Sequence, residues 1–204
     1  DRERFRAIAR RDRLAETLAG LRAAREAGFA PIKVNAVLMR GVNDGEIVSL
    51  ARWARDEGYE LRFIEWMPLD FQRGWDRSRL VPAAEVVATL EATFPLEPAS
   101  DDDPSAPART WRYRDGAGRV GTIASVTRPF CGRCDRIRLT ADGQIRTCLF
   151  SLREYDLRRA LRGGATDEEI AALLRAAVLR KEPGHLVNSA AFVQPGRGMS
   201  AIGG

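Results

Sequence analysis

The sequence has few cysteines, almost no histidine and no long hydrophobic run, and each shortage excludes a class of protein. Three cysteines and one histidine in 204 residues are too few for a disulfide scaffold. No run approaches the roughly 18 apolar residues of a membrane-spanning helix. Residues 1–13 are heavily charged and lack the apolar core of a secretory signal peptide. We therefore expect a cytoplasmic protein without a membrane partner.

Lysine is scarce too, because Lys33 and Lys181 are the only lysines among 33 basic residues. The net charge of +5 favours anionic partners without identifying one. Since the arginine bias extends over the whole chain, an isolated arginine is weaker evidence for phosphate binding than usual, and Lys33 is more informative. Hydrophobic residues make up 45% of the chain and charged residues 30%, so the chain can bury a core.

Hydrophobic periodicity predicts alternating helices and strands in the first third of the chain. The pattern indicates a helix over 11–27, a strand over 32–39, a helix from 43 to 57 and a strand over 61–66. This order is typical of βα units with a parallel sheet. Because two parallel strands do not form a stable sheet alone, we expect the chain to begin partway through a larger α/β domain, a barrel.

The rest of the chain predicts a mixed α+β region. A proline at a first helical turn predicts a helix over 82–94, and a polar loop follows it. The later predicted elements are strands at 110–114 and 120–126, a hairpin of 136–140 with 144–148, and two helices with capping-box spacing, at Ser151 with Glu154 and at Thr166 with Glu169. We expect two domains, residues 1–72 and residues 73–204.

All three cysteines fall in one short segment, where Cys131 and Cys134 are followed thirteen residues later by Cys148. The two-residue gap lets two thiolates face one metal centre, and the predicted hairpin returns the third to them. Metal coordination is therefore favoured over three unconnected buried thiols. Structural zinc requires four ligands, whereas a four-iron cluster on three thiolates keeps one iron open. The cluster is the preferred interpretation, and zinc completed by His185 or a carboxylate is the alternative.

The stretch TRPFCGRCDRIRLTADGQIRTCLF, residues 127–150, resembles the C-terminal cluster motif of the GTP 3′,8-cyclases, which are radical-SAM enzymes of molybdenum-cofactor biosynthesis. KVNAVLMRGVND and ELRFIEWMPL resemble late strands of that family's barrel, and MSAIGG resembles its C-terminus. The resemblance spans essentially the whole chain. It implies an α/β fold in which the C-terminal part of an incomplete radical-SAM (β/α) barrel precedes a mixed α+β cluster region.

The resemblance also implies roles for individual residues. It implies a [4Fe–4S] cluster held by Cys131, Cys134 and Cys148, GTP contacts by Arg136, Ile137, Arg138, Lys33 and Arg62, a SAM contact by Met67, and a contribution of Gly203 and Gly204 to the active site. Alternation on a strand places Arg136 and Arg138 on one face, where two guanidinium groups suit an anion. The alternative for Arg62 is a salt bridge, and the alternative for Met67 is core packing. Strand alternation places the side chains of Arg62 and Met67 on opposite faces.

In the complete enzyme of the family, SAM and a second [4Fe–4S] cluster convert GTP to (8S)-3′,8-cyclo-7,8-dihydroguanosine 5′-triphosphate. The chain has no C-x3-C-x2-C motif for that second cluster, so we expect it to supply the GTP-binding part and to be inactive alone. The implied partners are GTP, SAM, a reductant, cyclic pyranopterin monophosphate synthase as the next enzyme, and a second copy in a homodimer. The alternatives are a zinc-binding nucleic-acid module and another radical-SAM protein with an auxiliary cluster.

Overall fold

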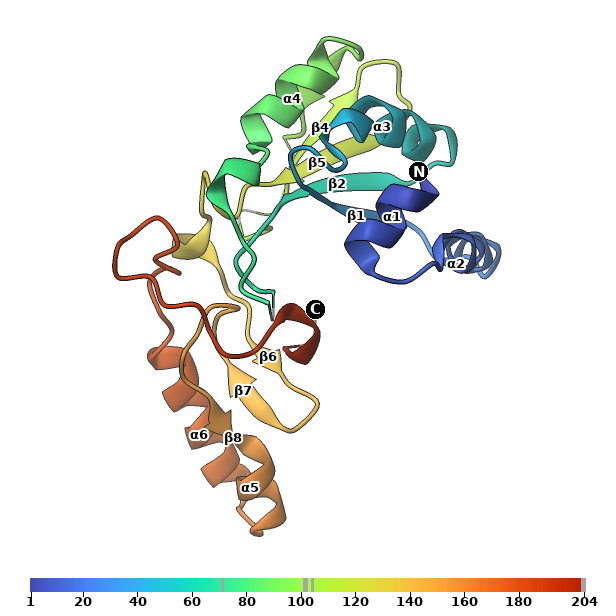
Figure 1. Cartoon of the computed structure of the whole chain (residues 1–204). Helices are drawn as coiled ribbons and strands as arrows, with labels where there is room; N and C mark the ends of the chain where they lie inside the picture. Colours follow the sequence, from blue (N-terminus) through green and yellow to red (C-terminus); the bar gives the residue numbers. More distant parts are fainter. Residues whose placement is uncertain (71, 101–102, 104, 203–204) are drawn as a thin grey trace. The chain divides into compact units, whose positions relative to one another are not determined.

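The computed structural model describes residues 1–70, 72–100, 103 and 105–202, which fall into two compact units (Figure 1). The sheet unit comprises residues 1–66 and 77–127, and the cysteine unit comprises residues 67–76 and 128–204. Each unit has its own sheet. The predicted α/β class is confirmed, whereas the barrel and the domain boundary after residue 72 stay predictions.

The sheet unit contains a five-stranded mixed sheet in the order β1-β2-β5-β4-β3. Its strands are β1 (Lys33–Leu38), β2 (Glu60–Glu65), β3 (Leu96–Pro98), β4 (Arg109–Tyr113) and β5 (Arg119–Ile123). Strands β1, β2 and β5 are parallel, as the alternation of helices and strands predicts for the first two, and β4 and β3 continue the sheet in antiparallel pairing. The sheet therefore combines a βα part with a hairpin extension.

Four α-helices belong to this described sheet unit, and two of them build its core. They are α1 (Arg2–Ala9), α2 (Leu14–Glu26), α3 (Ile47–Asp56) and α4 (Ala83–Glu91), with short 3-10 turns at Asp44–Glu46 and Arg77–Arg79. Apolar residues of α3 and α4 pack with Leu61 and Phe63 of β2 and Val120 of β5. In the described residues α1 and α2 bury no side chain. Sequence periodicity missed α1, because its composition is dominated by charge.

A buried carboxylate ties three segments of the sheet unit together at the end of β2. Glu65 is only 2% exposed. Its oxygens accept hydrogen bonds from the N–H groups of Ala83 (2.9 Å), Val126 (2.7 Å) and Thr127 (2.8 Å), and from the Thr127 hydroxyl (2.5 Å). Ala83 is the first residue of α4, where the helix dipole favours negative charge. Glu65 thus fixes both the start of α4 and the path that the chain takes after β5.

The cysteine unit contains a small antiparallel sheet in the order β6-β7-β8. Its elements are β6 (Arg138–Leu139), β7 (Gln144–Arg146), β8 (Tyr155–Asp156), α5 (Leu157–Arg162), α6 (Asp167–Leu179), and 3-10 turns at Cys131–Arg133 and Met199–Ala201. The predicted hairpin is confirmed by the antiparallel β6–β7 pair. Its turn needs a glycine, because Gly143 has φ +80° and a Cβ there would lie 2.6 Å from the Arg158 Cβ.

One of the two predicted capping boxes is present in the cysteine unit. Thr166 and Glu169 form a reciprocal capping box at the start of α6. The box predicted at Ser151 is wrong, because α5 begins at Leu157 with Asp156 as its cap. The Ser151 hydroxyl contacts Glu182 (2.5 Å), and Glu154 forms an ion pair with Arg146 (2.5 Å) instead. These contacts with distant residues replace the local cap.

Arg197 fastens the segment after residue 194 to the cysteine hairpin. Its guanidinium pairs with Asp142 in the hairpin turn and with Glu154, both at 2.7 Å. The hydrogen bond from Arg197, together with one from Thr140, lowers the pKa of Asp142 to about 2. The Met199 N–H also donates to the Leu69 carbonyl at 3.0 Å. The residues just before the C-terminus are therefore anchored within this unit.

None of the helices in the ranges described above is long and apolar enough to cross a membrane.

We predict that Glu65→Ala lowers the free energy of unfolding by about 3 kcal/mol or more, because several buried N–H donors lose their acceptor. Urea denaturation of the parent and the variant measures the difference. Glu91→Ala is the matched control, since Glu91 is an exposed residue at the end of α4, and it should change stability by less than about 0.5 kcal/mol. Equal losses in the two variants would contradict the role assigned to Glu65.

We predict that Arg197→Met raises the pKa of Asp142 from about 2 toward its ordinary value of about 3.9. Because the folded-state pKa is depressed, the parent gains stability from Asp142 above about pH 4 and loses it as the pH falls toward about 2. NMR titration of the Asp142 carboxyl measures the shift. Arg162→Met, at an exposed position, is the control, and an unchanged Asp142 titration in Arg197→Met would refute the pairing.

Candidate functional site

One face of the parallel strands carries the predicted GTP-contacting residues Lys33 and Arg62. Leu61 and Phe63 of β2 lie in the core, so Arg62 between them belongs to the opposite face. In the β1–β2 register Lys33 lies beside Glu60, and Asn35 lies beside Arg62. Lys33 and Arg62 are therefore diagonal neighbours on a polar face, although their predicted GTP contacts stay predictions.

The salt-bridge alternative for Arg62 is present in the structure. Its guanidinium donates to Glu60 on the same strand at 2.7 Å, and both side chains are largely buried. An anion would therefore compete with Glu60 for Arg62. Met67 follows β2 as the first residue of the 67–76 segment of the cysteine unit, and its predicted SAM contact stays a prediction.

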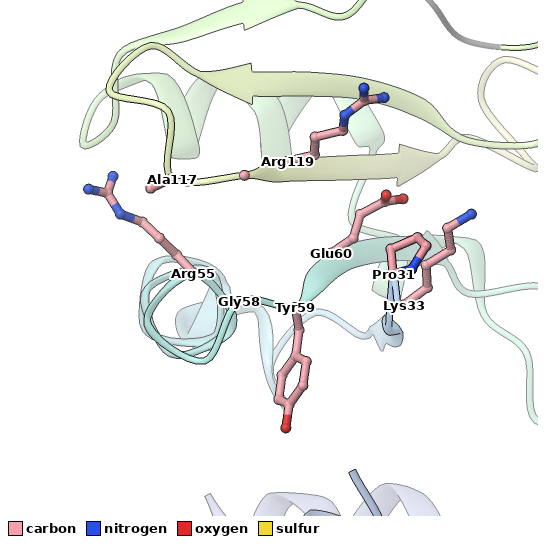
Figure 2. Close-up of a pocket in the computed structure, with 9 residues that line it drawn as sticks. Pro31, Lys33, Arg55, Gly58, Tyr59, Glu60, Ala117 and Arg119 are labelled. Carbon is pink, nitrogen blue, oxygen red and sulfur yellow. The ribbon is translucent and has the colours of Figure 1, made fainter. Parts of the chain in front are cut away.

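Lys33 lines a pocket of about 620 Å³ at the amino ends of β1, β2 and β5. Figure 2 shows Lys33, Glu60 and Arg119 extending from the same side of these strands. Arg55, also in the lining, is held by an ion pair with Asp115 and lies over the Tyr113 ring. Ligands of parallel sheets generally bind at the carboxyl ends of the strands. A GTP contact by Lys33 therefore requires its long side chain to extend along the polar face.

The cysteine unit places the three thiols around the open end of the β6–β7 hairpin. Cys131 begins a 3-10 turn that ends at Cys134, and Cys148 lies two residues beyond β7. All three are free thiols of intermediate exposure. Cys131 acts electrostatically on Cys148, and Cys134 and Cys148 both act on Arg138. The three cysteines thus belong to one part of the cysteine unit, where Cys131 is close enough to Cys148 to raise its pKa.

The donor chemistry of this segment fits a thiolate-bound group. The Arg136 guanidinium donates to the Cys134 Sγ at 3.4 Å, and the Phe150 N–H donates to the Cys148 Sγ at 3.5 Å. Such N–H···S bonds favour the thiolate, which is the form that binds metal. Among the described residues, however, no group of three or more His, Cys, Asp or Glu is arranged to hold a metal ion. The predicted [4Fe–4S] cluster therefore stays a prediction.

The pKa values of two of these thiols move in opposite directions. Burial acts to raise the pKa of Cys134, but hydrogen bonds and charge from Arg136, with the charge of Lys181, bring it below the ordinary value. Burial raises the pKa of Cys148, and the neighbouring Glu182 and Cys131 raise it further. Cys134 is therefore the more readily ionised of the pair.

Arg136 and Arg138 are half-buried, whereas Ile137 between them is 46% exposed. This alternation agrees with two guanidinium groups on one face of the strand. Arg136 lies over the Phe130 ring, 4.9 Å from its centroid. Burial and the charge of Arg136 lower the pKa of Arg138, although Cys148 and Cys134 oppose this effect. Arg138 therefore carries a positive charge that its surroundings compensate incompletely.

Sequence reasoning named His185 as an alternative zinc ligand, but it did not predict that residues 181–185 contact both cysteine-bearing segments. The Lys181 Nζ donates to the carbonyl oxygens of Arg136 (2.9 Å) and Thr147. Glu182 accepts a hydrogen bond from the Thr147 hydroxyl at 2.8 Å. Further along, Gly184 lies beside Cys131, and the His185 ring packs on Phe150 with centroids 5.0 Å apart. The scarcity of lysine in the sequence was the signal that could have pointed to Lys181, as it did to Lys33.

The predicted active-site residues Gly203 and Gly204 lie outside the described residues. Ile202, directly before them, is fully buried. The role of the Gly-Gly tail stays a prediction.

Comparisons with known proteins agree with the motifs. Residues 59–187 match the family described as Molybdenum Cofactor Synthesis C. A GTP 3′,8-cyclase of Streptomyces coelicolor is 55% identical over 201 residues, covering 98% of this chain and 59% of that protein. A Corynebacterium glutamicum protein of the same name is 50% identical over 209 residues, covering 100% and 55%.

A third relative, GTP 3′,8-cyclase 2 of Mycobacterium tuberculosis, is 52% identical over 208 residues, covering 100% of this chain and 58% of that protein. The chain thus spans a little over half the length of these relatives. The family match covers more than half of the chain and includes all three cysteines. The resemblance predicted from the motifs is confirmed, and the chain belongs to the Molybdenum Cofactor Synthesis C family.

Proposed function

We propose that this chain forms the GTP-holding part of a GTP 3′,8-cyclase, which with SAM converts GTP to (8S)-3′,8-cyclo-7,8-dihydroguanosine 5′-triphosphate in molybdenum-cofactor biosynthesis. The observation that carries the proposal is the cysteine segment, where three free thiols and two half-buried arginines flank the β6–β7 hairpin in the chain. The names of the relatives support the same activity.

In this proposal Cys131, Cys134 and Cys148 hold a [4Fe–4S] cluster. When bound, such a cluster offers one iron without a protein ligand, which can take an atom of the guanine base. Arg136 and the Phe150 N–H stabilise two of the thiolates. Arg138 contributes a half-buried positive charge, whose pKa is lowered by burial and by Arg136 and raised by Cys148 and Cys134. An anionic or polar group of GTP would relieve that charge.

The polar face of the sheet supplies the second half of the proposed site. Within the described residues β1 pairs only with β2, so its other edge is open to a further strand. Additional strands there would make residues 1–72 part of a radical-SAM (β/α) barrel, with Lys33 and Arg62 on its inner face. Positive charge inside a barrel is costly unless an anion pairs with it, which suits a triphosphate. Residues 73–204 would then form the cluster region.

The complete enzyme needs parts that these 204 residues do not contain. These parts are SAM, a second [4Fe–4S] cluster and a reductant for it. From this chain the enzyme would use Met67 as a SAM contact and the Gly203–Gly204 tail at the active site. We place the protein in the cytoplasm, as a homodimer, ahead of cyclic pyranopterin monophosphate synthase. Because the sequence has no C-x3-C-x2-C motif, the chain alone should not cleave SAM to 5′-deoxyadenosine.

We predict that anaerobic reconstitution with iron and sulfide gives a brown chain with a [4Fe–4S] EPR signal after reduction, and that GTP shifts this signal. The shift follows from binding of the base to the open iron. Cys148→Ser is the control, since it removes one thiolate and should lose the signal. Bound zinc in place of iron, or a cluster indifferent to GTP in a folded chain, would favour the zinc-binding module or another auxiliary-cluster protein.

We predict that Arg138→Met weakens GTP binding by about tenfold or more, because one charge-assisted contact is lost. Titration of the EPR shift with GTP measures the dissociation constant, at an iron content equal to that of the parent. Arg153→Met, at an exposed position of the same unit, should bind GTP as the parent does. If Arg138→Met kept its cluster and its affinity, the GTP contact would be assigned wrongly.

A further inference from the structure

We infer that Lys181 is a positioning residue for the cysteine site, because its ammonium group joins the backbone leading from Cys134 to the backbone leading into Cys148. The inference rests on the proposed function, in which these cysteines hold a cluster. Lys181 follows α6, and its Nζ donates to the carbonyl oxygens of Arg136 (2.9 Å) and Thr147. Arg136 lies two residues after Cys134, and Thr147 directly precedes Cys148.

The ammonium group acts where the hairpin ladder ends. The β6–β7 pairing consists of Leu139 with Ile145 and Arg138 with Arg146. Continuing this register past Arg146 brings Thr147 beside Ile137, so Arg136 and Thr147 lie at the open end of the ladder. Lys181 contacts a carbonyl of each segment there. Lys181 therefore links the segment after Cys134 to the segment before Cys148 at the point where the β6–β7 pairing ends.

A lysine suits this position better than the arginine that the chain uses almost everywhere else. Lys181 is one of only two lysines among 33 basic residues. An ammonium group presents three donors from a single point, whereas a guanidinium presents its donors in a plane. Carbonyl oxygens that converge on one point from two segments match the ammonium geometry. The geometry of the contact therefore favours a lysine over an arginine at position 181.

Glu182 strengthens the same contact through side chains. Its carboxylate accepts hydrogen bonds from the hydroxyl groups of Thr147 (2.8 Å) and Ser151 (2.5 Å). Both of these residues are only 1% exposed. Lys181 and Glu182 therefore bind the main chain and the side chain of Thr147. Because Thr147 directly precedes Cys148, these contacts restrict where the Cys148 thiol can lie.

The charge of Lys181 gives the inference a readout that a purely structural lysine would not have. The ammonium group acts electrostatically on both Cys134 and Cys148. A positive charge beside a thiolate-bound cluster favours its reduced, more negative state. Removal of that charge should therefore shift the reduction potential to a more negative value, in addition to loosening the site.

The test compares three reconstituted variants of the chain with the parent. Lys181→Met should release iron to a chelator about 10- to 100-fold faster, as loss of an outer contact does at metal sites, and its reduction potential should be more negative. Lys181→Arg keeps the charge, so its potential should stay near that of the parent while its iron release is intermediate. Arg180→Met, which removes the neighbouring exposed arginine, should match the parent in both.

Hydrogen exchange of the iron-free proteins separates this inference from the proposed function. Lys181→Met should increase amide exchange in residues 136–147 and leave the sheet unit unchanged. A parent chain that takes up no iron would overturn the cluster assignment, whereas unchanged exchange in iron-free Lys181→Met would overturn the role of Lys181. A loaded Lys181→Met protein with parental iron release and potential would overturn only the role of Lys181. If Lys181→Met does not fold, Lys181→Arg decides, and parental iron release by it would overturn the inference.

Discussion

Glu65 is almost completely buried. Its carboxylate has hydrogen-bond donors because backbone N–H groups from two other segments lie beside it. A buried charge without such partners would cost several kcal/mol. The start of α4 and the path after β5 must therefore meet at the end of β2. Thr127, which donates to Glu65 through both its N–H and its hydroxyl, lies four residues before Cys131.

Different interactions stabilise the interior of each unit. The sheet unit has a continuous apolar core between α3, α4 and the strands. The cysteine unit has strands of only two or three residues and relies on polar contacts between distant residues. Arg197 and Lys181 make two of these contacts, to the hairpin turn and to its open end.

The parts of the structure that follow from local patterns were predictable from the sequence. Apolar, β-branched runs identified β1 and β2, Thr166 with Glu169 identified the start of α6, and the Ala141-Asp142-Gly143 turn identified the cysteine hairpin. Alternation placed Arg62 and Met67 on opposite faces, and a salt bridge was an alternative for Arg62, but the sequence could not show that Glu60 is its partner.

The contacts that the sequence did not reveal join residues far apart in the chain. Lys181 reaches Arg136 and Thr147 across 45 and 34 residues, and no spacing rule connects such positions. The wrong prediction of a capping box at Ser151 has the same origin in a contact between distant residues. The Ser151 hydroxyl donates a hydrogen bond to Glu182 and is not used for a local cap. Segment 67–76 is likewise separated from the sheet unit that surrounds it in sequence. Periodicity detects an element and its buried face, whereas pairing between distant polar groups depends on the complete fold.

The distribution of charge around the thiols indicates where a ligand would gain most. Arg146 is neutralised by Glu154 at 2.5 Å, and Lys181 donates to two carbonyl groups beside Glu182. Arg136 rests on an aromatic ring and contacts a cysteine sulfur. Arg138 is half-buried, and burial and the charge of Arg136 lower its pKa, although Cys148 and Cys134 oppose this effect. A negatively charged or strongly polar group placed beside Arg138 would compensate its charge. The proposed function uses this position, because Arg138 is one of the predicted GTP contacts.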